Sequence, residues 1–261
     1  RTMIGSLSHN TKKFDGYFLD GKGQAHPAST PLGSLERLGK EGDPDVVYVN
    51  GIMTSLDRQL EDMTRLAKLG NRVVGVHNAT AGFFRDIGQS MMDKVNRGPN
   101  SAVTTVKSLV KTATAVGEQL KFVAHSQGAL VVSRAIDELL KEEAVTPESL
   151  SKISVDTYGG ASYTFPEGPK YHHHMNLCDP VPMLTGAGYQ GMLKHPPGVK
   201  MEFFARVQAP YRVPGEPWGK TMTRTFDRAI HGTAVYFNPD YEGRGIVWEK
   251  GAKKALALNP A

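Results

Sequence analysis

The sequence predicts an α/β protein with a mostly parallel sheet flanked by helices. Three observations support this fold class. Short apolar, β-branched segments recur from residue 45 onward, and several of them end at glycine. Between them lie longer segments whose apolar residues recur every three or four positions, as on one face of a helix. Strands that alternate with helices in this way are joined by right-handed crossovers into a parallel sheet.

The segment at residues 55–69 illustrates the helical pattern. Its leucines and its methionine are three or four residues apart, so they form one apolar stripe. Between residues 79 and 118 the pattern predicts two helices that are interrupted at Gly98-Pro99. The remaining predicted elements are strands at 45–50, 72–78, 119–124, 152–158, 171–177 and 200–207 and a helix at 129–143.

The chain is predicted to hold one domain. Residues 1–44 are rich in Gly, Pro, Ser and Thr, so we expect an extended N-terminal lead-in that lies on the domain. No internal repeat divides residues 45–261, which we expect to form the α/β domain itself. Residues 1–5 carry no apolar core of a signal peptide, and because the chain begins with Arg1 we expect it to have been trimmed or cut out of a longer chain.

Composition excludes several classes of protein. Hydrophobic residues make up 39% and charged residues 22%, as in ordinary globular domains, and no stretch of about 18 apolar residues predicts a transmembrane helix. The single cysteine excludes an internal disulfide. No basic stripe is interleaved with aromatic residues, so nucleic acid is not an expected partner. The net charge of +5 permits only a weak peripheral contact with an anionic membrane.

The most informative segment is Ala124-His125-Ser126-Gln127-Gly128, between an apolar strand and an apolar helix. Small residues at 124 and 128 permit a tight strand-to-helix turn that would present the Ser126 hydroxyl at the carboxyl edge of the sheet. Serine is also a common helix N-cap, which is the structural alternative. The strand before and the helix after favour a nucleophile. His125 is not expected to be the base, because an adjacent ring on a tight turn cannot easily reach Ser126.

This elbow resembles that of the α/β-hydrolase superfamily, in particular its lipases and esterases. The resemblance covers the pattern from about residue 45 to 237, and it implies the α/β-hydrolase fold and cofactor-free ester hydrolysis through an acyl-enzyme. Residues 49–54 and 78–80 are similar to bacterial lipase-like proteins, some of which are effector or toxin domains. That likeness implies a secreted or delivered effector, with a cytoplasmic protein as the alternative. For a toxin domain it implies a cognate inhibitor protein as partner.

Acyl transfer needs donors that face the developing oxyanion. The resemblance implies that the amide of Gln127 is one of them. We expect the other in the loop after the first strand, where Gly51 lets the chain turn and frees the amide of Ile52 or Met53. The family usually has His-Gly at this point, whereas this chain has Asn50-Gly51, so an ordinary strand-ending glycine also fits.

The family's chain order is Ser, then acid, then His. Asp179 is the favoured acid, because the strand at 171–177 delivers it to the sheet edge and prolines at 180 and 182 stiffen its loop. Asp-Pro is also common turn chemistry. Asp156, at the end of the preceding strand, is the alternative acid.

His231 is the favoured base. It follows the last predicted strand, and Gly232 permits a loop-to-helix turn that would project the imidazole back over the sheet edge. A histidine before a helix is more often a cap or a surface residue. His195 is the competitor, but two prolines directly after it predict an exposed loop.

The run His172-His173-His174 invites a metal interpretation. Residues 172 and 174 of a strand share one face and would supply two ligands. A zinc site needs further ligands, and Cys178 is poorly placed to provide one. We therefore expect a polar strand face, with no metal and no cofactor.

A lipid substrate is predicted from Phe83, Phe84, Met91 and Met92, which would form a soft apolar lid or an acyl groove. Residues of this kind more often fill a core, in which case the substrate is a small soluble ester. A thioesterase or amidase would use the same machinery. A catalytically inactive binding module is the remaining alternative, and the presence of a candidate for all three triad roles disfavours it.

Overall fold

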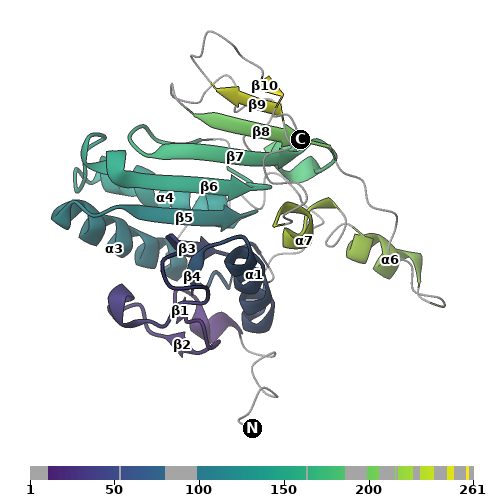
Figure 1. The fold of residues 1–261 in the computed structure, drawn as a ribbon, viewed down its shortest axis with the longest axis horizontal. Coiled ribbons are helices and arrows are strands. Elements are labelled where there is room, and N and C mark those ends of the chain that lie inside the picture. Colours follow the sequence, from purple (N-terminus) through teal and green to yellow (C-terminus); the bar gives the residue numbers. More distant parts are fainter. Residues whose placement is uncertain are drawn as a thin grey trace.

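The described residues form one β-sheet with helices on both of its faces (Figure 1). The computed structural model describes residues 11–52, 54–79, 99–162, 164–185, 199–205, 215, 217–225, 230–237, 246–249 and 257–258. Its strands are β1 (Phe18–Leu19), β2 (Ala25–His26), β3 (Asp45–Val49), β4 (Arg72–Val76), β5 (Leu120–His125), β6 (Ile153–Tyr158), β7 (Lys170–Asn176), β8 (Lys200–Phe204), β9 (Ile246–Glu249) and β10 (Ala257–Leu258). Its helices are α1 (Leu56–Lys68), α3 (Ser101–Val116), α4 (Gly128–Lys141), α6 (Trp218–Thr225) and α7 (Thr233–Tyr236), with short turns at η1 (Thr11–Phe14), η2 (Leu32–Ser34), η4 (Ser149–Lys152) and η5 (Val181–Thr185).

The strands of the described residues follow the order β10-β9-β8-β7-β6-β5-β3-β4-β1-β2. Neighbours from β4 to β8 are parallel, whereas β1 and β2 at one edge and β9 and β10 at the other pair antiparallel. The direction in which strands are added reverses after β4, because β3 lies between β4 and β5. Open α/β sheets place their ligand sites at the carboxyl ends of the strands beside such a reversal.

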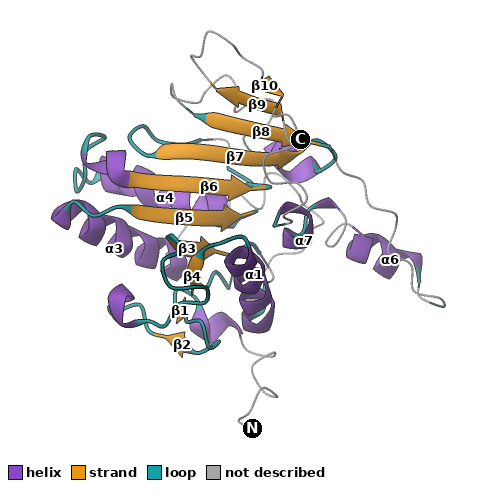
Figure 2. Cartoon of the chain, viewed as in Figure 1, coloured by secondary structure: helices purple, strands orange, loops and turns teal. Residues whose placement is uncertain are grey.

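Helices lie on both faces of the sheet (Figure 2), and a layer of buried hydrophobic side chains holds them against each face. α3 and α4 bury Val106 and Val131 in the layer on one face. α1 and α7 bury Met63 and Val235 in the layer on the other face. In β3, successive side chains alternate between the two layers, as the pleat of a strand requires. The central strands are therefore covered on both sides, which explains their continuous apolar runs.

Polar side chains cap the N-termini of α1 and α3. The Ser55 hydroxyl accepts a hydrogen bond from the backbone N–H of Arg58 at 3.2 Å and so caps α1. The Asn100 side chain accepts one from the N–H of Val103 at 2.9 Å and caps α3, which ends at Gly117 in the left-handed conformation.

Strands β6 and β7 differ in their burial pattern from β3 and β4. Along β6, buried residues alternate with partly exposed ones, and Asp156 belongs to the partly exposed set. Along β7, His173 is buried while His172 and His174 are partly exposed. This alternation is typical of a strand that packs one face on the core and turns a polar face outward.

The α/β fold class predicted from the sequence is confirmed, and the six strands and three of the four helices predicted between residues 45 and 207 are present among the described residues. The lead-in does more than lie on the domain, because β1 pairs with β4 and brings β2 with it into the sheet. Strands β9 and β10 were not predicted. Of the two helices expected between residues 79 and 118, the second is α3, and the first lies outside the described residues, as do Phe83, Phe84, Met91 and Met92.

Within the described ranges, no helix combines the length and the apolar character needed to cross a membrane.

Candidate active site

Ser126 occupies a strained turn between β5 and α4. Its φ of 53° lies in the left-handed region, which non-glycine residues seldom adopt. The turn is held by the Ser126 N–H, which donates to the Tyr158 carbonyl at 3.1 Å, and by the Ser126 carbonyl, which accepts from Ala161 at 3.0 Å. Gly128 is required because a Cβ there would lie 2.2 Å from the carbonyl oxygen of Val49. The turn therefore presses directly against the end of β3.

The structure brings Ser126, His231 and Asp179 together in one chain of hydrogen bonds. His231 Nε2 lies 2.8 Å from Ser126 Oγ, and His231 Nδ1 lies 2.6 Å from Asp179 Oδ2. All three residues are buried. An ionised carboxylate only accepts hydrogen bonds, so Nδ1 donates to Asp179 and Nε2 is left to accept from the hydroxyl. Residues that are far apart in the sequence thus form the arrangement in which a histidine can take a proton from a serine.

The three side chains lie at the ends of secondary-structure elements. Ser126 follows β5, Asp179 follows β7, and His231 directly precedes Gly232 and α7. The loop after β3 approaches the turn as well, since a Cβ on Gly51 would lie 2.9 Å from Ser126 Cβ. A parallel sheet with this strand order and a serine turn after β5 decides the fold. The fold is that of the α/β hydrolases.

Three solved structures show a partial likeness to this chain. A ferulic acid esterase from Streptomyces cinnamoneus is 14% identical at a TM-score of 0.44, with 82% of this chain and 66% of the esterase covered. A putative dienelactone hydrolase from Klebsiella pneumoniae is 12% identical at a TM-score of 0.39, with coverages of 76% and 88%. The lipase BlEst2 from Bacillus licheniformis is 13% identical at a TM-score of 0.33, with coverages of 62% and 72%. The chain thus spans just under two thirds of the ferulic acid esterase.

The sequence matches no protein-family model and no curated protein.

Asp179 is held by more than His231. Its Oδ1 accepts from the Val181 N–H at 2.9 Å, and its Oδ2 accepts from the Tyr236 hydroxyl at 2.6 Å. The same hydroxyl accepts from the Asn176 N–H at 3.2 Å. Burial, together with the charge of Asp179, raises the pKa of Tyr236 well above its usual range, so the phenol stays protonated and keeps donating. Tyr236 belongs to the site although sequence reasoning missed it; its place at the end of the four-residue α7 gave no signal.

A second network anchors the segment that carries His231. Asp62 of α1 accepts from the Thr233 hydroxyl, from Arg65 at 2.8 Å and from Tyr48 at 3.1 Å. Burial raises the pKa of Asp62, and these donors oppose that shift by favouring the carboxylate. Because Thr233 lies two residues after His231, the network fixes His231 relative to α1.

His125 contacts His231 through the backbone. Its Nε2 lies 2.8 Å from the His231 carbonyl oxygen, so it donates to that carbonyl. Burial, with the neighbouring His231 as a smaller cause, lowers the pKa of His125 to about 3. A neutral imidazole facing a carbonyl supports the position of His231, and its Nε2 is engaged away from Ser126.

The predicted oxyanion loop lies beside the turn. The buried Gln127 side chain accepts from Asn78 at 2.9 Å, and Asn50 donates to the Asn78 carbonyl at 2.9 Å. These contacts link the end of β3, the end of β4 and the residue after Ser126. Ile52 directly follows Gly51, which touches Ser126, whereas Met53 lies outside the described residues.

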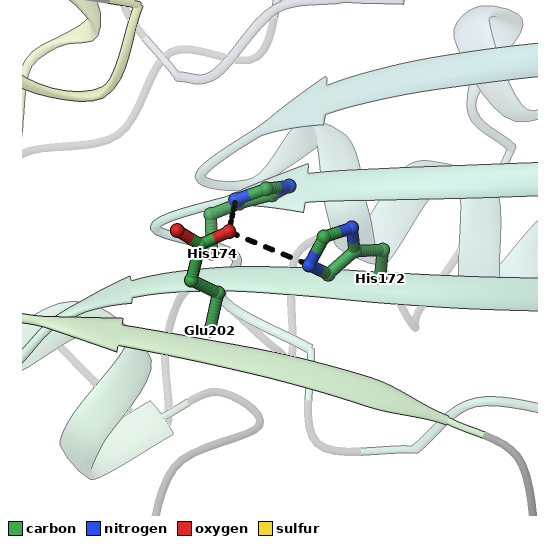
Figure 3. Close-up of side chains that lie close together, drawn as sticks. All are labelled: His172, His174 and Glu202. Atoms are coloured by element: carbon green, nitrogen blue, oxygen red, sulfur yellow. Dashed lines mark ion pairs between the residues drawn. The ribbon is translucent and has the colours of Figure 1, made fainter. Parts of the chain in front are cut away.

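The alternative site residues lie elsewhere. Asp156 forms an ion pair with Lys121 at 2.7 Å, within the sheet and opposite His172. His195 lies outside the described residues. Among the residues the structure describes, one group could hold a metal: His172, His174 and Glu202, on β7 and β8 (Figure 3).

The Tyr236 contact makes a testable difference to stability. We expect Tyr236→Phe to lower the free energy of unfolding by about 1.5–3 kcal/mol, because it removes a donor from a buried carboxylate. The matched control is Tyr171→Phe, which removes a donor to the neutral Pro166 carbonyl at 2.8 Å and should cost about 0.5–1.5 kcal/mol. Urea unfolding followed by circular dichroism measures both losses. A control that loses as much as Tyr236→Phe contradicts the account.

Proposed function

We propose that this chain is a serine hydrolase of carboxylic esters, with Ser126 as nucleophile, His231 as base and Asp179 as acid. The observation that carries the proposal is the continuous hydrogen-bond chain from Ser126 Oγ through both ring nitrogens of His231 to Asp179. The strained turn that holds Ser126 at the end of β5 also supports the proposal. A strained φ at a buried hydroxyl is a feature of reactive sites.

The geometry supports an acyl-enzyme route in two halves. Ser126 Oγ attacks the acyl carbon while its proton passes to His231 Nε2, and the imidazolium is stabilised by Asp179. The proton then passes from Nε2 to the departing alkoxide, which leaves as the alcohol. In the second half, Nε2 takes a proton from water, the hydroxide attacks the acyl-enzyme, and Ser126 regains its proton as the carboxylic acid departs.

The oxyanion would be stabilised by backbone amides. The amide of Gln127, at the start of α4, and that of Ile52 or Met53 are the proposed donors. The N-terminus of α4 adds a favourable partial charge. The hydrogen bonds of Asn78 and Asn50 support this role, since they hold both donor segments in place before substrate binds.

Other functions have less support. An inactive binding module would have no need to keep three buried polar groups in mutual hydrogen-bond contact, because burying them is costly. A thioesterase or amidase would use the same three residues, so substrate assays must separate these activities. The effector role, the cognate inhibitor and peripheral membrane contact stay predictions from the sequence.

Within the ester class, we propose a lipid or phospholipid substrate. The proposal rests on the apolar residues at 83, 84, 91 and 92, on the resemblance of the Ala124–Gly128 turn to those of lipases, and on the mild positive charge of the chain. A small soluble ester is the competing substrate.

The test uses wild type and Ser126→Ala on two substrates. The first is a short p-nitrophenyl ester, and the second is liposomes of phosphatidylethanolamine and phosphatidylglycerol. We expect wild type to cleave both and Ser126→Ala to lose about 10³-fold or more of each rate, because no other group can form the acyl-enzyme. Circular dichroism checks that the variant folds.

The two substrates separate the two levels of the proposal. A variant that keeps most of the ester rate shows that Ser126 is not the nucleophile. Brisk ester cleavage without release of fatty acid from liposomes removes the lipid substrate and leaves a general esterase.

A second pair of variants distinguishes the two candidate acids. Asp179→Asn should lower kcat about 10³–10⁴-fold, because an amide cannot hold His231 in the productive tautomer. Asp156→Asn should leave kcat within about threefold, since the Asp156 carboxylate pairs with Lys121. Steady-state kinetics on the p-nitrophenyl ester gives both values, and the reverse ranking would transfer the acid role to Asp156.

A further inference from the structure

A cluster distinct from the Ser126 site lies on the polar face of β7 and β8. His172 and His174 are alternate residues of β7, so they project from the same face. β8 runs parallel to β7, and Glu202 lies directly opposite His174 in the register. Figure 3 shows the Glu202 carboxylate turned toward both imidazoles. The pairing of the two strands thus brings three side chains of metal-ligand type together.

The distances within this cluster fit a small ion. Glu202 Oε2 lies 3.1 Å from His174 Nδ1 and 3.6 Å from His172 Nε2. One ligand atom from each residue lies within 4.8 Å of the others. Donors bound about 2.1 Å from a tetrahedral zinc ion are about 3.4 Å apart. Small side-chain rotations therefore suffice to place all three donors around one ion.

The three side chains of the cluster differ in exposure and in how they are held. The Glu202 side chain is only 7% exposed, whereas that of His172 is 31% exposed. The His174 ring stacks on Tyr158 with ring centroids 4.2 Å apart and planes 1° apart, which sets the direction of its nitrogens. The cluster thus combines a buried carboxylate, one oriented imidazole and one partly exposed imidazole.

We propose that His172, His174 and Glu202 bind a zinc ion. Two imidazole nitrogens and one carboxylate oxygen suit zinc, whereas calcium and magnesium prefer oxygen ligands throughout. Three protein ligands leave a fourth position for water. Asp156 lies opposite His172, but its carboxylate is paired with Lys121 and is not needed as a ligand.

The bound ion would join β7 to β8. β7 is also the strand that leads into the Asp179 loop, and the cluster contains none of the three residues Ser126, His231 and Asp179. Zinc binding is therefore expected whether or not the chain hydrolyses esters. Because the ion binds only the folded arrangement, it should raise the thermal stability of the chain.

The test is equilibrium dialysis of the chelator-treated protein against zinc chloride. We expect wild type to bind one zinc per chain at micromolar concentration and Glu202→Gln to bind at least about tenfold more weakly. Replacing the partly exposed His172 by Asn should weaken binding in the same way and is the variant least disturbing to the fold. His26→Gln, which removes a histidine that contacts Asp20, and Ser126→Ala are the controls and should bind as wild type.

Thermal unfolding supplies an independent readout. Saturating zinc should raise the Tm of wild type by about 5 °C or more and leave that of Glu202→Gln unchanged. Two results would overturn the site. The first is that wild type binds no zinc even at a free zinc concentration of about 100 µM. The second is that wild type, Glu202→Gln and His172→Asn bind zinc equally well. In either case the contacts of Glu202 with the two histidines are ion pairs without a metal ion.

Discussion

The turn at Ser126 is the constraint on which the rest of the site depends. A serine with φ of 53° costs about 1–3 kcal/mol, and the surrounding contacts must over-determine that conformation. They do so from three sides: β6 through the Tyr158 carbonyl, the segment after β6 through Ala161, and β3 through its close contact with Gly128. Contacts with the sheet therefore fix the position of the Ser126 hydroxyl.

Buried polar groups complete the site and link it to both layers of the fold. Asp179 and Asp62 are buried carboxylates. Each accepts hydrogen bonds from several donors, which compensate the desolvation penalty that an unpaired buried charge would carry in full. The two networks meet at the segment 231–236, where Thr233 contacts Asp62 and Tyr236 contacts Asp179. Displacement of α7 would disturb both networks at once, so His231 is held in place by α1 as well as by Asp179.

The sequence was most informative where one strand or one turn determines the outcome. The buried central strands follow from their apolar runs, and Ser126, Asp179 and His231 were proposed from the chain order of the family that the sequence resembles. Contacts that depend on pairing between distant segments were not visible. Glu202 joins the two histidines only through the β7–β8 register, and Tyr236 reaches Asp179 only once α7 is packed. Strands β1 and β2 span two residues each, too short for any periodicity to show.

The central claim is that Ser126 is a nucleophile activated by His231. A fluorophosphonate probe reacts with such a serine, and peptide mass spectrometry locates the adduct. The account predicts one adduct on Ser126 in wild type and much slower labelling in a folded His231→Ala variant, which lacks the base. A folded protein that is not labelled at Ser126, or that is labelled equally fast without His231, would contradict it.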